Sequence, residues 1–86
     1  MTASPLTMIE QAIVQILDVD PRHEIAGREL RSLLRSRGFR RSAPALVFTM
    51  MSLADKRLVD CREEIRIVDG VEIRDRYYRA ATGRGY

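Results

Sequence analysis

The chain has 86 residues, of which 45% are hydrophobic and 31% are charged, and this predicts one small soluble domain over residues 1–86 and excludes a multi-domain enzyme. No apolar run approaches the roughly 20 residues of a membrane span, and the first residues lack the layout of a signal peptide, so we expect a cytoplasmic protein. The single cysteine, Cys61, and the single histidine, His23, cannot supply a zinc site with four protein ligands.

The net charge of +3 is distributed unevenly. Residues 1–21 carry three acidic side chains and no basic one, whereas residues 22–41 carry seven arginines against two glutamates. Fourteen of the fifteen basic residues are arginine. Recognition of phosphate or carboxylate by the bidentate guanidinium group predicts such a bias, and a GC-rich coding sequence explains it equally well.

The first predicted helix covers residues 5–18. It begins at Ser4, with Pro5 in its first turn, or at Thr7, which forms a capping box with Glu10. Its apolar face is wider than the usual stripe of a surface helix. That face contains Leu6, Ile9, Ala12, Ile13, Val14, Ile16 and Leu17. The width suits a helix buried centrally in a small core, or one that also contacts a partner subunit.

A turn over residues 19–23, with His23 at the surface, separates this helix from a second one predicted over residues 27–36. The expected buried stripe of the second helix consists of Leu30, Leu33 and Leu34. The arginines that are three and four residues apart, and therefore share the expected solvent face, are Arg28, Arg31 and Arg35. Gly38 is suited to a left-handed cap, and Phe39 is expected to pack on the core from the loop.

The third predicted helix covers residues 43–56 and starts at Ser42 or Ala43. Helical spacing places inward the residues Leu46, Val47, Met50, Leu53 and Ala54. The same spacing places outward the residues Ala45, Phe48, Thr49, Met51, Ser52 and Asp55. Phe48 and Met51 are unusually apolar for an outward face.

From Leu58 onward apolar and polar residues alternate, which predicts a β-hairpin over residues 58–80 and a loose tail over 82–86. We expect a three-residue loop, 68–70, with Gly70 left-handed, because this register pairs Ile67 with Val71 and Ile65 with Ile73 on one face. The alternative two-residue loop puts Ile65 opposite Arg74 and scatters the apolar residues over both faces. Cys61 is expected to point inward.

Three helices followed by a two-stranded β-hairpin form the α+β plan of a winged helix-turn-helix domain, in which the third helix enters a DNA groove and the hairpin is the wing. Over about residues 6–82 the chain resembles the PadR-like transcription regulators first and the MarR-like regulators second. The resemblance rests on three stretches: residues 25–30 (IAGREL), residues 53–59 (LADKRLV) and residues 76–79 (RYYR). Arg57 stands where the family usually has glycine.

This resemblance implies a cytoplasmic, sequence-specific transcriptional regulator that binds double-stranded DNA as a homodimer. PadR-like regulators carry a C-terminal dimerisation helix, which these residues lack, so we expect dimerisation through the first helix or the hairpin. The sequence does not identify a small-molecule effector.

For DNA binding, Arg40 and Arg41 precede the third helix, where they can reach phosphates beside the backbone N–H groups near Ser42. Thr49 and Ser52 can bond base edges, and Ala45 can pack on a thymine methyl group. The candidate DNA-binding residues are therefore Arg28, Arg31, Arg40, Arg41, Ser42, Ala45, Thr49 and Ser52. Alternatively, the arginines form a solvated face and Ser42 is only a helix cap.

No catalytic arrangement, cofactor motif or glycine-rich phosphate loop is present in the sequence, so we expect neither enzymatic activity nor a cofactor. The alternative function is a winged-helix protein interaction module that acts through the hairpin and the outward Phe48 and Met51, without DNA binding.

Overall fold

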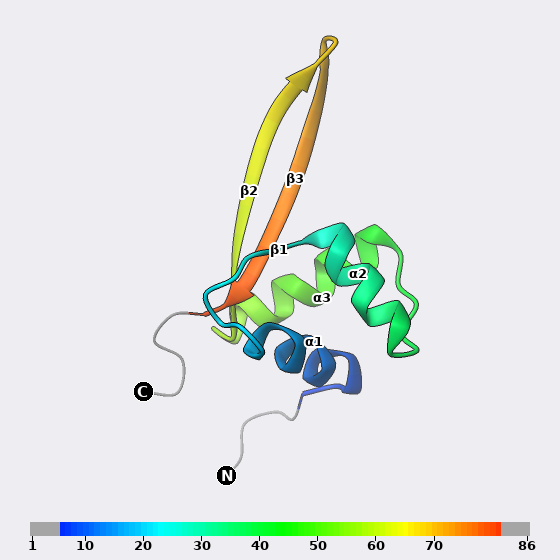
Figure 1. Cartoon of the computed structure of the whole chain (residues 1–86), viewed down its shortest axis with the longest axis vertical. Helices are drawn as coiled ribbons and strands as arrows, with labels where there is room; N and C mark the ends of the chain where they lie inside the picture. The colour runs from blue at the N-terminus through cyan, green and yellow to red at the C-terminus, as the bar shows by residue number, and fades with distance from the viewer. Residues whose placement is uncertain (1–5, 82–86) are drawn as a thin grey trace.

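A computed structural model describes residues 6–81 of the chain. The described part is an α+β arrangement of three helices and a three-stranded antiparallel sheet with strand order β1-β3-β2 (Figure 1). The elements are α1 (Met8–Asp18), β1 (Ile25–Ala26), α2 (Gly27–Ser36), α3 (Ala43–Asp55), β2 (Val59–Val68) and β3 (Val71–Ala80). The predicted start at Ser4 or Pro5 and the predicted tail, 82–86, lie outside the described residues.

The helix starts follow from side-chain caps. Of the two predicted starts of α1, the capping box at Thr7 is confirmed: the helix begins at Met8, because Glu10 N donates to Thr7 Oγ1 at 3.2 Å and Thr7 N donates to Glu10 Oε1 at 2.9 Å. At α3, Ala45 N donates to Ser42 Oγ at 3.2 Å, so Ser42 is the N-cap.

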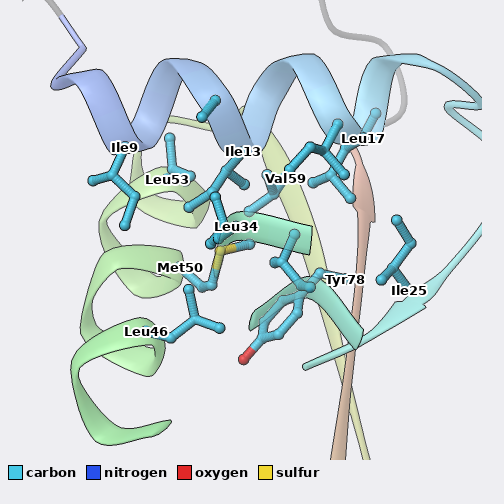
Figure 2. Packing of buried hydrophobic residues seen from close by; sticks show 14 residues of the cluster. Ile9, Ile13, Leu17, Ile25, Leu34, Leu46, Met50, Leu53, Val59 and Tyr78 are labelled. Atoms are coloured by element: carbon cyan, nitrogen blue, oxygen red, sulfur yellow. The ribbon is translucent and has the colours of Figure 1, made fainter. Parts of the chain in front are cut away.

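The core lies between the three helices and the base of the sheet (Figure 2). The wide apolar face of α1 is used inside the chain, because Ile13 and Leu17 are almost fully buried and Val14 packs against the core. In α2 only Leu30 and Leu34 are buried, so the expected burial of Leu33 is wrong: its side chain is 37% exposed. Phe39 packs against the core as expected.

The helices α2 and α3 end in the same hydrogen-bonded motif. After α2, Gly38 N donates to Arg35 O and Phe39 N to Leu34 O, at 3.0 and 2.9 Å. After α3, Arg57 N donates to Ala54 O and Leu58 N to Leu53 O, at 2.9 and 3.0 Å. These are Schellman motifs, whose C′ residue is left-handed. Gly38 takes that position with φ 90°, as predicted, and Arg57 takes it with φ 61°.

The sheet has three strands, so the predicted two-stranded hairpin is incomplete. Residues Ile25 and Ala26 form the additional strand β1, with Ile25 opposite Tyr78 and Ala26 opposite Tyr77. The side chain of Ile25 is buried at 7% exposure, which anchors α2 to the base of the hairpin. A strand of two residues is too short to show alternation in the sequence.

The predicted hairpin register is wrong. Val68 lies opposite Val71 and Ile65 opposite Arg74, so the loop has two residues, Asp69 and Gly70. Both have positive φ, 51° and 77°, as a type I′ turn requires. Gly70 is left-handed as expected, but Asp69 also adopts this conformation.

The hairpin projects well beyond the helices (Figure 1). Ile67 is 73% exposed and Val71 is 61% exposed. Beyond its base, therefore, the hairpin has no core to select a sided register. Cys61 is exposed, contrary to the prediction, because the buried part of β2 ends at its first residue, Val59. In residues 6–81 no helix combines the length and apolar character needed to span a membrane.

Candidate nucleic-acid interface

The basic part of the chain folds as α2 and the loop that leads into α3. Residues 27–42 contain six arginines and one acidic residue, Glu29, for a net charge of +5. None of these six arginines forms an ion pair with a carboxylate of the described residues. Arg37 Nη1 donates to Gln15 Oε1 at 3.3 Å, and Arg41 Nη1 donates to the carbonyl of Arg40 at 3.0 Å. The region therefore presents uncompensated positive charge.

Three arginines gather at the amino end of α3. Arg35, Arg40, Arg41 and the cap Ser42 line a cleft of about 390 Å³. A helix amino end carries partial positive charge and attracts anions, and here exposed guanidinium groups stand around it. The sequence predicted Arg40, Arg41 and Ser42 for this place. The sequence predicts Arg35 on the solvent face of the second helix but does not predict that it joins this group.

A second cleft of about 210 Å³ lies between α2, α3 and β3. From α2 it receives Arg28 and Arg31, which were both predicted as site residues. Arg31 is only partly exposed, and its Nε is buried with no hydrogen-bond partner among the described residues. The first residue of α3, Ala43, also lines this cleft. The two clefts therefore meet the start of α3 at the neighbouring residues Ser42 and Ala43.

The strand β3 forms the other wall of the second cleft. It contributes Arg74, Asp75, Arg76, Tyr77 and Tyr78. The sequence did not place the hairpin beside Arg28 and Arg31, because that proximity depends on the pairing of β1 with β3. Burial raises the pKa of the Tyr78 hydroxyl, so this side chain is a neutral part of the wall.

The outward face of α3 has few free polar groups. Thr49 Oγ1 donates to Ala45 O at 3.1 Å, although its oxygen can still accept a bond. Ser52 does not point outward as predicted: its Oγ donates to Glu10 Oε2 of α1 at 3.2 Å. Phe48 is 72% exposed and Met51 is 54% exposed, so the outward face is largely apolar.

Glu10 is a buried structural carboxylate that the sequence identified only as a cap. Its side chain accepts bonds from Thr7 N, Ser52 Oγ and Lys56 Nζ, with Lys56 at 3.1 and 3.2 Å from its two oxygens. The Thr7 N–H and the Lys56 ammonium hold the pKa of Glu10 below its usual 4.5, against the opposing effect of burial. Ser52 and Lys56 therefore connect α3 to α1 and are less available for a ligand.

The hairpin contrasts with α2, because its charges are paired within the chain. Five arginines and six acidic residues lie in residues 59–80, for a net charge of −1. Ion pairs join Arg66 to Asp75 at 2.9 Å, Arg74 to Glu72 at 3.1 Å, Arg76 to Glu63 at 3.3 Å and Arg79 to Asp60 at 3.7 Å.

Arg62 is the most extensively bound arginine of the hairpin. Its guanidinium contacts Glu24 at 2.8 Å, pairs with Glu64 and lies 4.6 Å from the centroid of the Tyr77 ring. The bonds from Arg62 lower the pKa of Glu24, and those from Glu24 and Glu64 raise the pKa of Arg62.

His23 lies exposed in the turn after α1, as predicted. Within the described ranges, no three metal-ligating side chains come together. Comparison of the chain with protein-family models and with curated proteins gives no match.

Proposed function

We propose that the chain is a winged helix-turn-helix domain that binds double-stranded DNA as a transcriptional regulator, with α3 in the major groove. The observation that carries this proposal is the set of six arginines in residues 27–42 that have no carboxylate partner in the described chain. Guanidinium groups without carboxylate partners are suited to a phosphate backbone, because each phosphate contact releases condensed counterions.

The proposed contacts divide into two classes. Phosphates are bound by Arg35, Arg40 and Arg41 at the amino end of α3, and by Arg28 and Arg31 in the neighbouring cleft. Bases are contacted by Ala45 and Thr49, whereas the bond from Ser52 to Glu10 keeps Ser52 out of the groove. With so few base-reading groups, we expect most of the affinity to be independent of sequence.

The first test measures binding of the chain to a random DNA duplex over a salt series by fluorescence anisotropy. Replacing Arg40 and Arg41 by alanine should weaken binding to every sequence and flatten the salt slope by about two units, one for each lost phosphate contact. Arg62→Ala with Arg79→Ala is the matched control, because it removes the same charge from arginines that are already ion-paired and that line neither arginine cleft. No duplex binding by the wild type at about 50 mM salt would exclude the proposal.

The second candidate function is a protein interaction module, and the exposed apolar groups on α3 favour it. Pro44, Val47 and Phe48 line a shallow cleft of about 310 Å³ together with Ala43 and Arg76. An apolar surface at a helix face is typical of protein interfaces. Phe48→Ser distinguishes the two functions, because it leaves the arginines in place. It should leave the salt slope of DNA binding unchanged and abolish binding of a protein partner.

A further inference from the structure

The outer edge of β2 is an unpaired strand edge in the described sheet. Strand order β1-β3-β2 places β2 at one side, with all ten of its residues paired only to β3. Exposed edges of this length promote pairing with another chain unless they are blocked. The edge contains no proline, and Ile65 and Ile67 on it are 55% and 73% exposed.

The hairpin register determines which backbone groups face outward. A two-residue loop closes on a hydrogen-bonded pair, here Val68 with Val71, and hydrogen-bonded pairs recur at every second residue. Arg66 and Glu64 therefore bond to β3, whereas Ile67, Ile65 and Glu63 direct their N–H and C=O groups away from it. These outward groups are ready to pair with another strand.

We propose that two copies of this chain pair antiparallel through the outer edges of β2, with Ile65 of one copy opposite Ile65 of the other. The two hairpins then form one continuous four-stranded sheet around a two-fold axis. An axis perpendicular to the sheet keeps equivalent faces on the same side, as an isologous contact requires. This pairing does not depend on the proposed DNA binding.

The charge sequence of β2 and the space needed by the helical bodies together favour the centre at Ile65. In that register Glu64 lies opposite the partner's Arg66 and Arg66 opposite the partner's Glu64, so two attractive pairs form at the closely spaced positions, in addition to the pairs of Glu64 with Arg62 and of Arg66 with Asp75 inside each chain. A centre at Glu64 or at Glu63 sets the central glutamate against its own copy, although the centre at Glu63 also brings opposite charges together. A centre at Cys61 sets Asp60 opposite the partner's Arg62, but it brings the two Val59 residues to roughly 13 Å from each other, where the helical bodies collide. A centre at Arg66 sets two arginines against each other, and a centre at Ile67 brings no opposite charges together.

The same register gathers the exposed isoleucines. Ile65 faces the partner's Ile65, and each Ile67 is a diagonal neighbour of the Ile65 across the seam, so four isoleucines form one row on one face of the sheet. The helical bodies lie at opposite ends of this sheet. Val59 lies six positions before Ile65, so the two Val59 residues stand roughly 40 Å apart and the bodies do not collide.

The alternative dimer surface on α1 is already occupied. The apolar face that suggested it packs into the core of the same chain, with Ile13 and Leu17 almost completely buried. The self-complementary charges therefore lie on β2, and the partner that matches them is a second copy of the same strand.

The decisive experiment uses charge reversal and mixing of full-length chains, read by sedimentation velocity over a concentration series. The wild type should dimerise, and Glu64→Arg alone or Arg66→Glu alone should raise the dimer dissociation constant at least tenfold, because each sets like charges across the seam. An equimolar mixture of the two variants should form a heterodimer close to wild-type affinity, since opposite charges then face each other. The double variant should also form a homodimer.

Arg74→Glu is the matched control, because it reverses a charge on β3, one strand away from the seam, and should leave the dimer intact. Ile65→Pro is a second probe in case charge reversal disturbs the hairpin. It removes an outward N–H that β3 does not use, so the hairpin should persist while the dimer is lost. The proposal would be overturned if the wild type is monomeric at several hundred micromolar. It would also be overturned if the single variants still dimerise, or if their mixture stays monomeric.

Discussion

The helical body and the hairpin use the same residue types in opposite ways. In the body, apolar side chains such as Leu53 are buried, and the arginines of α2 have no carboxylate partner among the described residues. In the hairpin, isoleucines such as Ile67 are exposed, and the arginines are held by neighbouring acids. The body is therefore stabilised by burial and leaves the arginines of α2 without carboxylate partners among the described residues, whereas the hairpin pairs its arginines with acids and leaves apolar side chains exposed.

The test with the largest expected change in the free energy of unfolding compares truncations of apolar side chains in the two regions. Leu53→Ala should lower the free energy of unfolding by about 3 kcal/mol, because Leu53 is completely buried and its loss leaves a cavity. Ile67→Ala should change it by less than about 0.5 kcal/mol when measured by urea denaturation of the dilute monomer. A comparable loss for Ile67→Ala under those conditions would mean that the hairpin packs on the body.

A second test compares a buried carboxylate with an exposed one. Glu10→Gln should cost about 2 kcal/mol at neutral pH, because it leaves Lys56 without its buried charge partner. Glu72→Gln removes an exposed pair with Arg74 and should cost less than about 0.5 kcal/mol. Urea denaturation of both variants provides the comparison.

The free energy of unfolding should depend on pH through the ionisation of Glu10. The pKa of Glu10 in the folded chain lies below its usual 4.5, so its contribution to stability is complete above pH 4.5 and is lost as the pH falls through the folded value. Glu10→Gln should remove this part of the acid dependence. Asp20→Asn, at an exposed position, is the control. An unchanged acid profile in Glu10→Gln would contradict the assignment.

The contrast also explains which parts of the structure could be predicted from the sequence. Helical spacing located all three helices to within a few residues, and Leu46, Met50 and Leu53 were correctly placed inward, because burial imposes that pattern. The hairpin register was wrong for the same reason. The predicted register requires one apolar face to be buried, and beyond Val59 no core is present to bury it.

The candidate site divides in a similar way. Arg40, Arg41 and Ser42 are contiguous in sequence and were found together, whereas the joining of Arg28 and Arg31 to β3 depends on a long-range strand pairing. The position of Ser52 depends on Glu10, which is 42 residues away, and helical spacing alone does not reveal such a partner. Surface charge was readable from the sequence, but side-chain partners were not.

If the turn, rather than apolar sidedness, sets the hairpin register, then the turn residues should control the hairpin. Gly70→Val should destabilise the hairpin by about 1 kcal/mol or more, because a β-branched residue resists the φ of 77°. Amide hydrogen exchange in β2 and β3 should accelerate about tenfold while the amides of α1 stay unchanged. Asp69→Asn, which tolerates the left-handed conformation, is the control and should have little effect. Unchanged exchange in Gly70→Val would assign the register to side-chain pairing instead.

The smallest expected effect lies at the junction of the two regions, where Arg57 occupies the position that Gly38 takes after α2. A side chain in the left-handed conformation is strained, so Arg57→Gly should raise the free energy of unfolding by up to about 1 kcal/mol. Gly38→Arg should lower it by a similar amount through backbone strain alone, because a Cβ at position 38 would have no heavy atom within 4 Å other than those of Gly38 and its chain neighbours.

Urea denaturation of the two variants measures these effects, and a salt series of DNA binding adds an independent readout. Arg57 lies outside the basic residues 27–42, so Arg57→Gly removes one positive charge but should leave the salt slope unchanged, whereas Arg40→Ala should lower it by about one unit. If Arg57→Gly instead destabilises the chain, the guanidinium makes a contact that outweighs the strain. If it also flattens the salt slope, the DNA-binding surface extends from the body onto the base of the hairpin. The separation of unpaired arginines in the body from ion-paired arginines in the hairpin then does not hold at the junction of the two regions.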